Sequence, residues 1–192
     1  MDGTFDTAPL FFVQIFTIHV FVGEKLIPLI YCLMARKSRE AYKKLFRVLK
    51  DKAIENQVHL EPQFITIDFE SGLIPAINSE FPSVEIHGCY FHFCQAIHRK
   101  IRHVGLALSY QENPQIRLTT RMLMALAFLP SNMIHLGFTE ICNSTPENIR
   151  LEMEQVLNYM SVQWLPENTV RLWNVYGLDR RTNNDLEGWH LR

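Results

Sequence analysis

Three acidic residues stand where a folded chain could use them for chemistry. Asp68 directly follows the apolar run Phe64–Ile67, and in open α/β sheets the carboxyl end of a buried strand faces the ligand crevice. Asp2 lies at the start of the chain and Glu187 near its end. Carboxylates held close together repel one another, and divalent cations relieve that repulsion. Each residue also has an ordinary alternative, a turn or cap for the aspartates and a favourable helix-dipole position for Glu187, so spacing alone does not make them a site.

A second group of residues suited to chemistry follows Gly88. Its pattern, Cys-x2-His-x-Cys-x3-His, contains residue types that bind zinc. If Gly88 opens a helix, successive residues turn by about 100°, so that Cys89 and His92 share one face while Cys94 and His98 share another. The four side chains do not converge, and we therefore expect no zinc site. Cys94 and His98 are interpreted as packing residues.

The charged residues are unevenly distributed along the chain. Eight basic and two acidic residues lie between positions 36 and 52, whereas residues 53–98 contain six acidic residues and no Lys or Arg. Separated charges of this kind suit a polyanion-binding face beside an acidic pocket, although a solvated helix face is the alternative. The candidate phosphate contacts are Arg36, Lys37, Arg39, Lys43, Lys44, Arg47, Arg99, Lys100 and Arg102.

Strands and one long helix must position these residues. Phe11–Val22 is rich in β-branched and aromatic residues and predicts a strand, and Leu26–Met34 predicts its antiparallel return. Pro28 in the second strand requires an edge position or a bulge. Ser38 is the expected N-cap of an amphipathic helix that runs to about Gln57.

The remaining pattern alternates short strands with helices and then becomes helical throughout. The predicted elements are a strand at Phe64–Ile67, a helix at Gly72–Asn78, a strand at Val84–His87 and a helix from Gly88 to about Leu108. After Pro114 we expect helices only, one of them capped by Thr145 with Pro146 in its first turn. This order predicts a mixed α/β sheet layered with helices.

Composition and length narrow the class of protein. The chain has 192 residues, of which 47% are hydrophobic and 20% charged, and its formal net charge is −1. It is long enough for one domain with a real core and too apolar for a disordered tail. Its apolar runs are shorter than a membrane span, its start is acidic where a signal peptide is basic, and its four cysteines do not suit a secreted disulfide framework. We expect a soluble intracellular domain.

Several motifs match one known family in the same order along the chain. They are Asp2-Gly3-Thr4-Phe5, Gln14-Ile15-Phe16-Thr17-Ile18-His19, Ile67-Asp68, Phe81-Pro82, Cys89-Tyr90-Phe91-His92, Trp173-Asn174-Val175-Tyr176 and Arg181-Thr182-Asn183-Asn184-Asp185-Leu186-Glu187-Gly188-Trp189-His190. Each motif is weak alone. Together they make the chain resemble the MULE (Mutator-like element) transposase domain from Asp2 to its last residue.

The resemblance implies an α/β fold of the RNase H-like type, a mixed sheet flanked by helices. It further implies a single catalytic domain over residues 1–192, with an all-helical insertion at about 109–176 before the last catalytic helix. The chain begins one residue before Asp2, so we expect the first strand of the sheet to be truncated.

The resemblance also implies a DDE active site formed by Asp2, Asp68 and Glu187. These residues would hold two Mg²⁺ or Mn²⁺ ions, which activate the attacking oxygen and stabilise the leaving oxygen of a phosphodiester. The implied reaction is cleavage at transposon ends followed by strand transfer into target DNA. The three residues implied to support this site are Cys89, His92 and His190.

The resemblance implies DNA as the partner, allows for a homo-oligomer and involves no membrane. A DNA substrate implies a nuclear location, although the chain carries no clear localisation signal. Two other functions stay open at this point. The first is a catalytically inactive, truncated or host-retained remnant that binds DNA or protein, and the second is a small zinc-binding interaction module.

Overall fold

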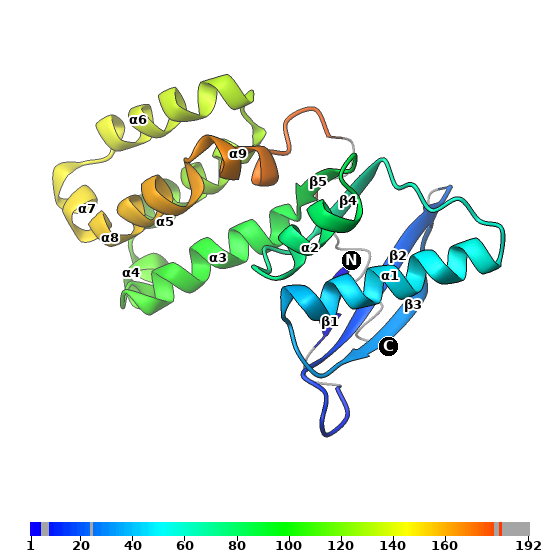
Figure 1. Cartoon of the computed structure of the whole chain (residues 1–192). Coiled ribbons are helices and arrows are strands. Elements are labelled where there is room, and N and C mark those ends of the chain that lie inside the picture. The colour runs from blue at the N-terminus through cyan, green and yellow to red at the C-terminus, as the bar shows by residue number, and fades with distance from the viewer. Residues whose placement is uncertain (5–7, 24, 179–180, 182–192) are drawn as a thin grey trace. The chain divides into compact units, whose positions relative to one another are not determined.

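The computed structural model describes residues 1–4, 8–23, 25–178 and 181, with the side chains of all of these except Asp2 and Thr4. The chain divides into two compact units, a first unit that includes Met1–Ile86 and a second unit, His87–Thr182 (Figure 1). Each is described by itself below. Among the described residues, no helix is long and apolar enough to cross a membrane.

An antiparallel sheet of three strands opens the first unit. The strands are β1 (Asp2–Thr4), β2 (Gln14–Val22) and β3 (Lys25–Met34), in that order across the sheet. Asp2 itself is the first residue of β1 and lies opposite Thr17 of β2. Strand β1 comprises three residues. The expectation that β2 starts at Phe11 is wrong, because Phe11 adopts a left-handed φ of 83° in a turn and the strand begins at Gln14.

Pro28 is accommodated as the sequence predicted. Strand β3 is at the edge of the three-stranded sheet, and the register with β2 shifts between Ile18 and His19, so that His19 lies opposite Pro28 while Ile18 lies opposite Ile30. Proline has no backbone N–H to donate to a neighbouring strand. At a bulge or an edge position the sheet does not need that hydrogen bond.

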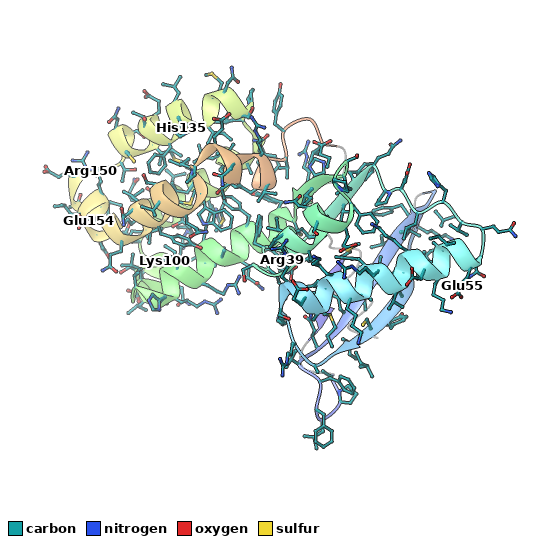
Figure 2. The ribbon with its side chains drawn as sticks, viewed as in Figure 1. Arg39, Glu55, Lys100, His135, Arg150 and Glu154 are labelled. Atoms are coloured by element: carbon teal, nitrogen blue, oxygen red, sulfur yellow. The ribbon has the colours of Figure 1, made fainter. Side chains whose placement is uncertain are left out.

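Helix α1 (Arg39–Glu55) follows the sheet. Its predicted cap is confirmed, because the Ser38 hydroxyl oxygen accepts a hydrogen bond from the backbone N–H of Ala41 at 3.4 Å. The helix ends at Glu55, two residues before the predicted end, and Gln57 has a left-handed φ of 56° that a continuing helix does not allow. Figure 2 labels Arg39 and Glu55 at the two ends of α1.

A second pair of strands completes the α/β pattern. Strand β4 (Phe64–Ile67) pairs with β5 (Glu85–Gly88), and helix α2 (Leu73–Glu80) lies between them in the sequence. The boundary between the two units falls within β5. All three elements were predicted, β4 with the same bounds and α2 and β5 with ends that differ by one or two residues.

The core of the first unit joins these elements. The Tyr42 ring of α1 packs edge-on against Phe16 of β2 at 5.2 Å, and Phe46 packs against Phe81 at 5.5 Å between ring centroids. Tyr42 also brings a hydroxyl into the core, and a buried hydroxyl requires hydrogen-bond partners. The buried members of this core are Phe16, Ile18, Met34, Tyr42, Phe46, Ile65, Ile67, Leu73, Ala76, Ile77 and Phe81.

The described elements that follow β5 are all helical, as predicted. They are α3 (Tyr90–His103), α4 (Ala107–Glu112), α5 (Pro114–Ala125), α6 (Ile134–Ser144), α7 (Glu147–Glu152), α8 (Glu154–Tyr159) and α9 (Glu167–Trp173), with short 3₁₀ or π segments at Leu126–Phe128, Ser131–Met133 and Met160–Trp164. Their core is aromatic. The Phe93 ring stacks on Trp173 at 4.5 Å and meets Trp164 edge-on at 4.9 Å.

Two helix boundaries in the second unit differ from the prediction. The helix expected to reach Leu108 ends at His103, because Gly105 adopts a left-handed φ of 81°, which stops a helix. Thr145 does not cap the helix that follows it. It is the C-cap of α6, where its hydroxyl donates to the Ile141 carbonyl at 2.6 Å, and Pro146 takes the N-cap position of α7.

The predicted fold class is confirmed at the level of a mixed α/β chain with small sheets and many helices.

Candidate functional site

The chain segments that carry Asp2 and Asp68 lie side by side in the first unit. The N-terminal ammonium of Met1 donates a hydrogen bond to the Thr66 carbonyl oxygen at 2.9 Å. Asp2 follows Met1 directly in β1, and Asp68 comes two residues after Thr66, just beyond the end of β4. Since consecutive Cα atoms are only about 3.8 Å apart, this bond brings the backbones of the two aspartates close together although 65 residues lie between them.

Glu187 and His190 fall outside the described residues, as does the side chain of Asp2. Among the side chains that the structure does describe, no group of three or more His, Cys, Asp or Glu residues could hold a metal ion. The described part of the predicted DDE triad is therefore the Asp68 side chain and the backbone of Asp2.

A polar network that the sequence analysis missed lies beside Asp68. The amide nitrogen Nε2 of Gln14 donates to the Tyr42 hydroxyl at 2.7 Å, and that hydroxyl donates in turn to Oε2 of Glu70. The second carboxylate oxygen of Glu70 accepts from Nζ of Lys37 at 2.8 Å. Two donors thus meet at one carboxylate, which lies two residues after Asp68.

The charge state of Tyr42 follows from its surroundings. Burial raises the pKa of the Tyr42 hydroxyl above its ordinary value of about 10, and the hydrogen bond to Glu70 raises it further. The negative charges of Glu70 and Asp68 act in the same direction. The hydroxyl therefore keeps its proton and remains a donor to Glu70 at neutral pH, and the charge of Asp68 is near enough to be felt there.

A close approach of two backbones fixes the loop that carries Asp68. A Cβ placed on Gly72 would lie 2.5 Å from the Lys37 carbonyl oxygen and 3.1 Å from the Arg39 nitrogen. Gly72 precedes α2, while Lys37 and Arg39 flank the start of α1. Only glycine permits this packing of the Asp68–Gly72 loop against the segment that enters α1.

The basic residues of the α1 region divide into paired and unpaired groups. Lys37 is bound to Glu70, and Arg47 pairs with Glu80 at 3.1 Å. No ion pair with a described acidic residue is found for the other four candidate phosphate contacts of this region, Arg36, Arg39, Lys43 and Lys44. The sequence analysis predicted phosphate contact for all six residues without distinguishing them. In the structure two of them already hold carboxylates of the first unit.

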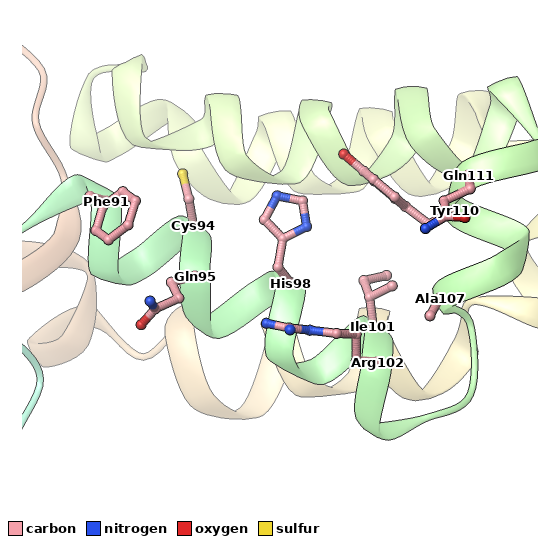
Figure 3. A pocket seen from close by; sticks show the side chains of 9 residues that line it. All are labelled: Phe91, Cys94, Gln95, His98, Ile101, Arg102, Ala107, Tyr110 and Gln111. Carbon is pink, nitrogen blue, oxygen red and sulfur yellow. The ribbon is translucent and has the colours of Figure 1, made fainter. Parts of the chain in front are cut away.

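The Cys/His segment lies in the second unit. Cys89 is fully buried at the N-cap of α3, and His92 is half-buried one turn later. Cys94 and His98, which the sequence analysis interpreted as packing residues, line a cavity of about 420 Å³ that Tyr110 of α4 also borders (Figure 3). Burial raises the pKa of the Cys94 thiol, and burial followed by the charge of Arg102 lowers the pKa of His98.

The other basic candidates belong to α3. Arg99 and Arg102 are exposed, whereas the Nζ atom of Lys100 lies 5.6 Å from the centre of the Tyr159 ring. A lysine over an aromatic face gains a cation–π interaction. Lys100, labelled in Figure 2, is thus partly engaged within the second unit.

The missed residues had only weak signals in the sequence. Tyr42 fits the apolar face of an amphipathic helix, and Gln14 is the first residue of a strand. Glu70 is separated from Asp68 by one residue, and that spacing is common in loops. Nothing in the local sequence connects Gln14 with Tyr42, or Tyr42 with Glu70, since each pair is separated by 28 positions.

Comparison with known proteins identifies a family. A family model described as the MULE transposase domain matches residues 1–96. The matched region includes Asp2, Asp68, Cys89 and His92, and also the newly found network. No curated protein and no solved structure shows a significant match to the chain.

Proposed function

The chain belongs to the MULE transposase domain family, and from that premise we propose that it is a DDE-type transposase catalytic domain. The proposed reaction is cleavage of DNA phosphodiester bonds at transposon ends and transfer of the cut strand into target DNA. The proposed fold around the site is the RNase H-like arrangement of sheet and helices, and the proposed setting is the nucleus, where the DNA substrate lies.

One observation carries this proposal, the hydrogen bond between Met1 and Thr66. This bond joins the residue directly before Asp2 to Thr66 of β4, the strand that Asp68 directly follows. Strands β1 and β4 belong to separate sheets in the described structure, so the support for a shared site is the closeness of the two backbones at this bond.

The chemistry of these donors suits hard divalent cations. Mg²⁺ and Mn²⁺ prefer oxygen ligands and are commonly held by one or two carboxylates together with substrate phosphates. Asp2 and Asp68 supply such oxygens, and family resemblance adds Glu187 as the third. When bound, two such ions would supply the activation of the attacking oxygen and the stabilisation of the leaving oxygen.

The chain's own residues bind and orient the DNA. Arg36, Arg39, Lys43 and Lys44 supply positive charge around the start of α1, in the same unit as Asp68. Arginine and lysine contacts to phosphates set the position of a duplex without reading its sequence. We therefore expect the protein to cut DNA of many different sequences. We also expect its affinity for DNA to fall strongly as the salt concentration rises.

The test is nicking of supercoiled plasmid by the full chain with Mg²⁺ or Mn²⁺. Asp68→Asn removes a charged ligand without changing the size of the side chain, and Asp51→Asn on the exposed side of α1 is its matched control. We expect at least about 100-fold slower nicking for Asp68→Asn, beyond the 10–100-fold effect typical of residues that only support a ligand. Wild type without metal-dependent nicking would favour the inactive remnant, and equal rates for wild type and Asp68→Asn would remove Asp68 from the mechanism.

A further inference from the structure

The loop from Asp68 to Gly72 is fastened to the start of α1 at three points. Tyr42 donates to one oxygen of Glu70, and Lys37 donates to the other. The third point is the close backbone approach at Gly72. A loop residue such as Asp68 usually has more freedom than a residue in a strand or helix, and these contacts remove much of that freedom.

Glu70 is placed to hold the loop and not to act as a ligand. Both of its carboxylate oxygens are engaged by donors, and only 15% of its side chain is exposed. Hydrogen bonds to an ionised carboxylate are short and strong. Releasing Glu70 toward a cation would break both bonds and leave the partly buried Tyr42 hydroxyl without an acceptor for its proton.

The network also reaches the strand beside Asp2. Gln14, which is fully buried, donates to the Tyr42 hydroxyl and lies in β2. Strand β2 pairs with β1, the strand that begins at Asp2. A chain of hydrogen bonds from β2 through α1 to Glu70 therefore links the element that holds Asp2 to the loop that holds Asp68.

We propose that Glu70, fixed by Tyr42 and Lys37, is a positioning residue that sets the Asp68 carboxylate for coordination of a divalent cation. This inference rests on the proposed function, because it assigns Asp68 the role of a metal ligand. Residues that orient a metal ligand without binding the metal themselves are common at metal sites. Their loss weakens metal binding by about 10–100-fold.

The first unit offers a matched control for this role. Glu80, at the end of α2, is a carboxylate with 10% exposure that binds two cations of α1, Arg47 and Lys50. It resembles Glu70 in burial and charge and is also bound by two side chains, but it is twelve residues from Asp68 in the sequence and does not belong to the Asp68–Gly72 loop. A purely structural role predicts the same behaviour for the two glutamates.

The experiment measures Mn²⁺ binding to the full chain by titration calorimetry, together with the thermal unfolding midpoint without metal. The variants are Tyr42→Phe, Glu70→Gln and Glu80→Gln. Tyr42→Phe matters most, because it removes the hydrogen bond while leaving every charge in place. We expect about 10-fold or greater loss of Mn²⁺ affinity for Tyr42→Phe and Glu70→Gln. For Glu80→Gln we expect no change in Mn²⁺ affinity, even if its unfolding midpoint falls as far as those of the other two variants.

The double variant Tyr42→Phe/Glu70→Gln should lose little more affinity than either single variant, since the two residues act through one contact. Wild-type affinity in Tyr42→Phe, or an equal loss in Glu70→Gln and Glu80→Gln, would overturn the inference. If Tyr42→Phe does not fold, the difference in Mn²⁺ affinity between Glu70→Gln and Glu80→Gln still tests the inference.

Failure of the inference is distinguishable from failure of the proposed function. In the same titration, Asp68→Asn should abolish most of the Mn²⁺ affinity. Unchanged binding in Asp68→Asn contradicts the proposed function itself. A loss in Asp68→Asn with wild-type binding in Tyr42→Phe and Glu70→Gln contradicts only the positioning role.

Discussion

The two units satisfy most of their buried polar groups in different ways. In the second unit, Trp173, Thr120 and Thr145 each donate to a backbone carbonyl, and the Thr119 and Thr145 hydroxyls also lie 3.4 Å apart. In the first unit, a chain of side-chain bonds runs from Gln14 to Tyr42 and from Tyr42 to Glu70. Carbonyl positions are set by the helices themselves, so a bond to a carbonyl adds stability without fixing a second side chain.

This difference between the units shows where hydrogen bonds fix the conformation of individual side chains. A network of side chains drawn from a strand, a helix and a loop forms only when all three are in place, and it then fixes the conformation of each member. The first unit has such a network next to the aspartate proposed for chemistry. The second unit has instead an aromatic core whose contribution is packing.

The largest effect is expected from breaking that aromatic core. Phe93→Ala removes the ring that stacks on Trp173 and meets Trp164, and we expect a loss of about 3–5 kcal/mol in the free energy of unfolding. Denaturant titration followed by tryptophan fluorescence measures it. Leu151→Ala, at a side chain that is 66% exposed, is the control and should stay within about 0.5 kcal/mol. A small loss for Phe93→Ala would contradict the packing account of the second unit.

A smaller effect is expected at the backbone contact of the first unit. In Gly72→Ala the new methyl group would lie 2.5 Å from the Lys37 carbonyl, so one of the two segments must move. Forced rearrangements of this kind cost about 1–3 kcal/mol, and we expect the Mn²⁺ affinity to fall as well because the loop carries Asp68. The exposed neighbour Ser71→Ala is the control. An unfolding midpoint equal to wild type would show that the contact is not tight.

The local hydrogen bonds of the second unit should matter less. Thr120→Val removes a bond from a buried hydroxyl to the Ile116 carbonyl at 2.8 Å, and we expect a loss of about 1 kcal/mol. Thr139 makes the same kind of bond to His135 at an exposed position, so Thr139→Val is a matched control with a smaller loss. Thermal unfolding measures both variants. A fall in Mn²⁺ affinity in Thr120→Val would contradict the claim that the local hydrogen bonds of the second unit contribute only to stability.

The smallest effect concerns the pH dependence of the second unit. Because burial, and next the charge of Arg102, lower the pKa of His98, folding disfavours its protonated form. This contribution to stability is present above the unfolded-state pKa of about 6.5 and is lost as the pH falls through the lower folded-state pKa. His98→Gln should flatten that part of a plot of unfolding midpoint against pH. An unaltered profile in His98→Gln would contradict the prediction.

The fold was largely accessible from the sequence because its signals are local. The β-branched and aromatic content of Phe11–Val22, the cap at Ser38 and the apolar spacing of α1 each depend on neighbouring residues. The errors arose where backbone conformation competes with pattern. Phe11 and Gly105 adopt left-handed φ values, and these ended or delayed elements that periodicity alone would continue.

The candidate site was accessible only in part. Asp68 could be predicted from its position at the end of an apolar run, and Asp2 from family motifs. The Glu70 network could not, because its bonds span 28 and 33 residues and its members look like ordinary helix, strand and loop positions. Glu187 and His190 stay predictions of the family resemblance.

The most direct test of a shared metal site is a double-mutant cycle on Mn²⁺ binding to the full chain, with Asp2→Asn, Asp68→Asn and the double variant. If both carboxylates bind the same ions, each single change lowers the affinity at least about 100-fold and the double variant loses far less than the sum of the two free-energy changes. Wild-type affinity in either single variant, or fully additive losses, would contradict the claim that the hydrogen bond between Met1 and Thr66 brings the two aspartates to one site.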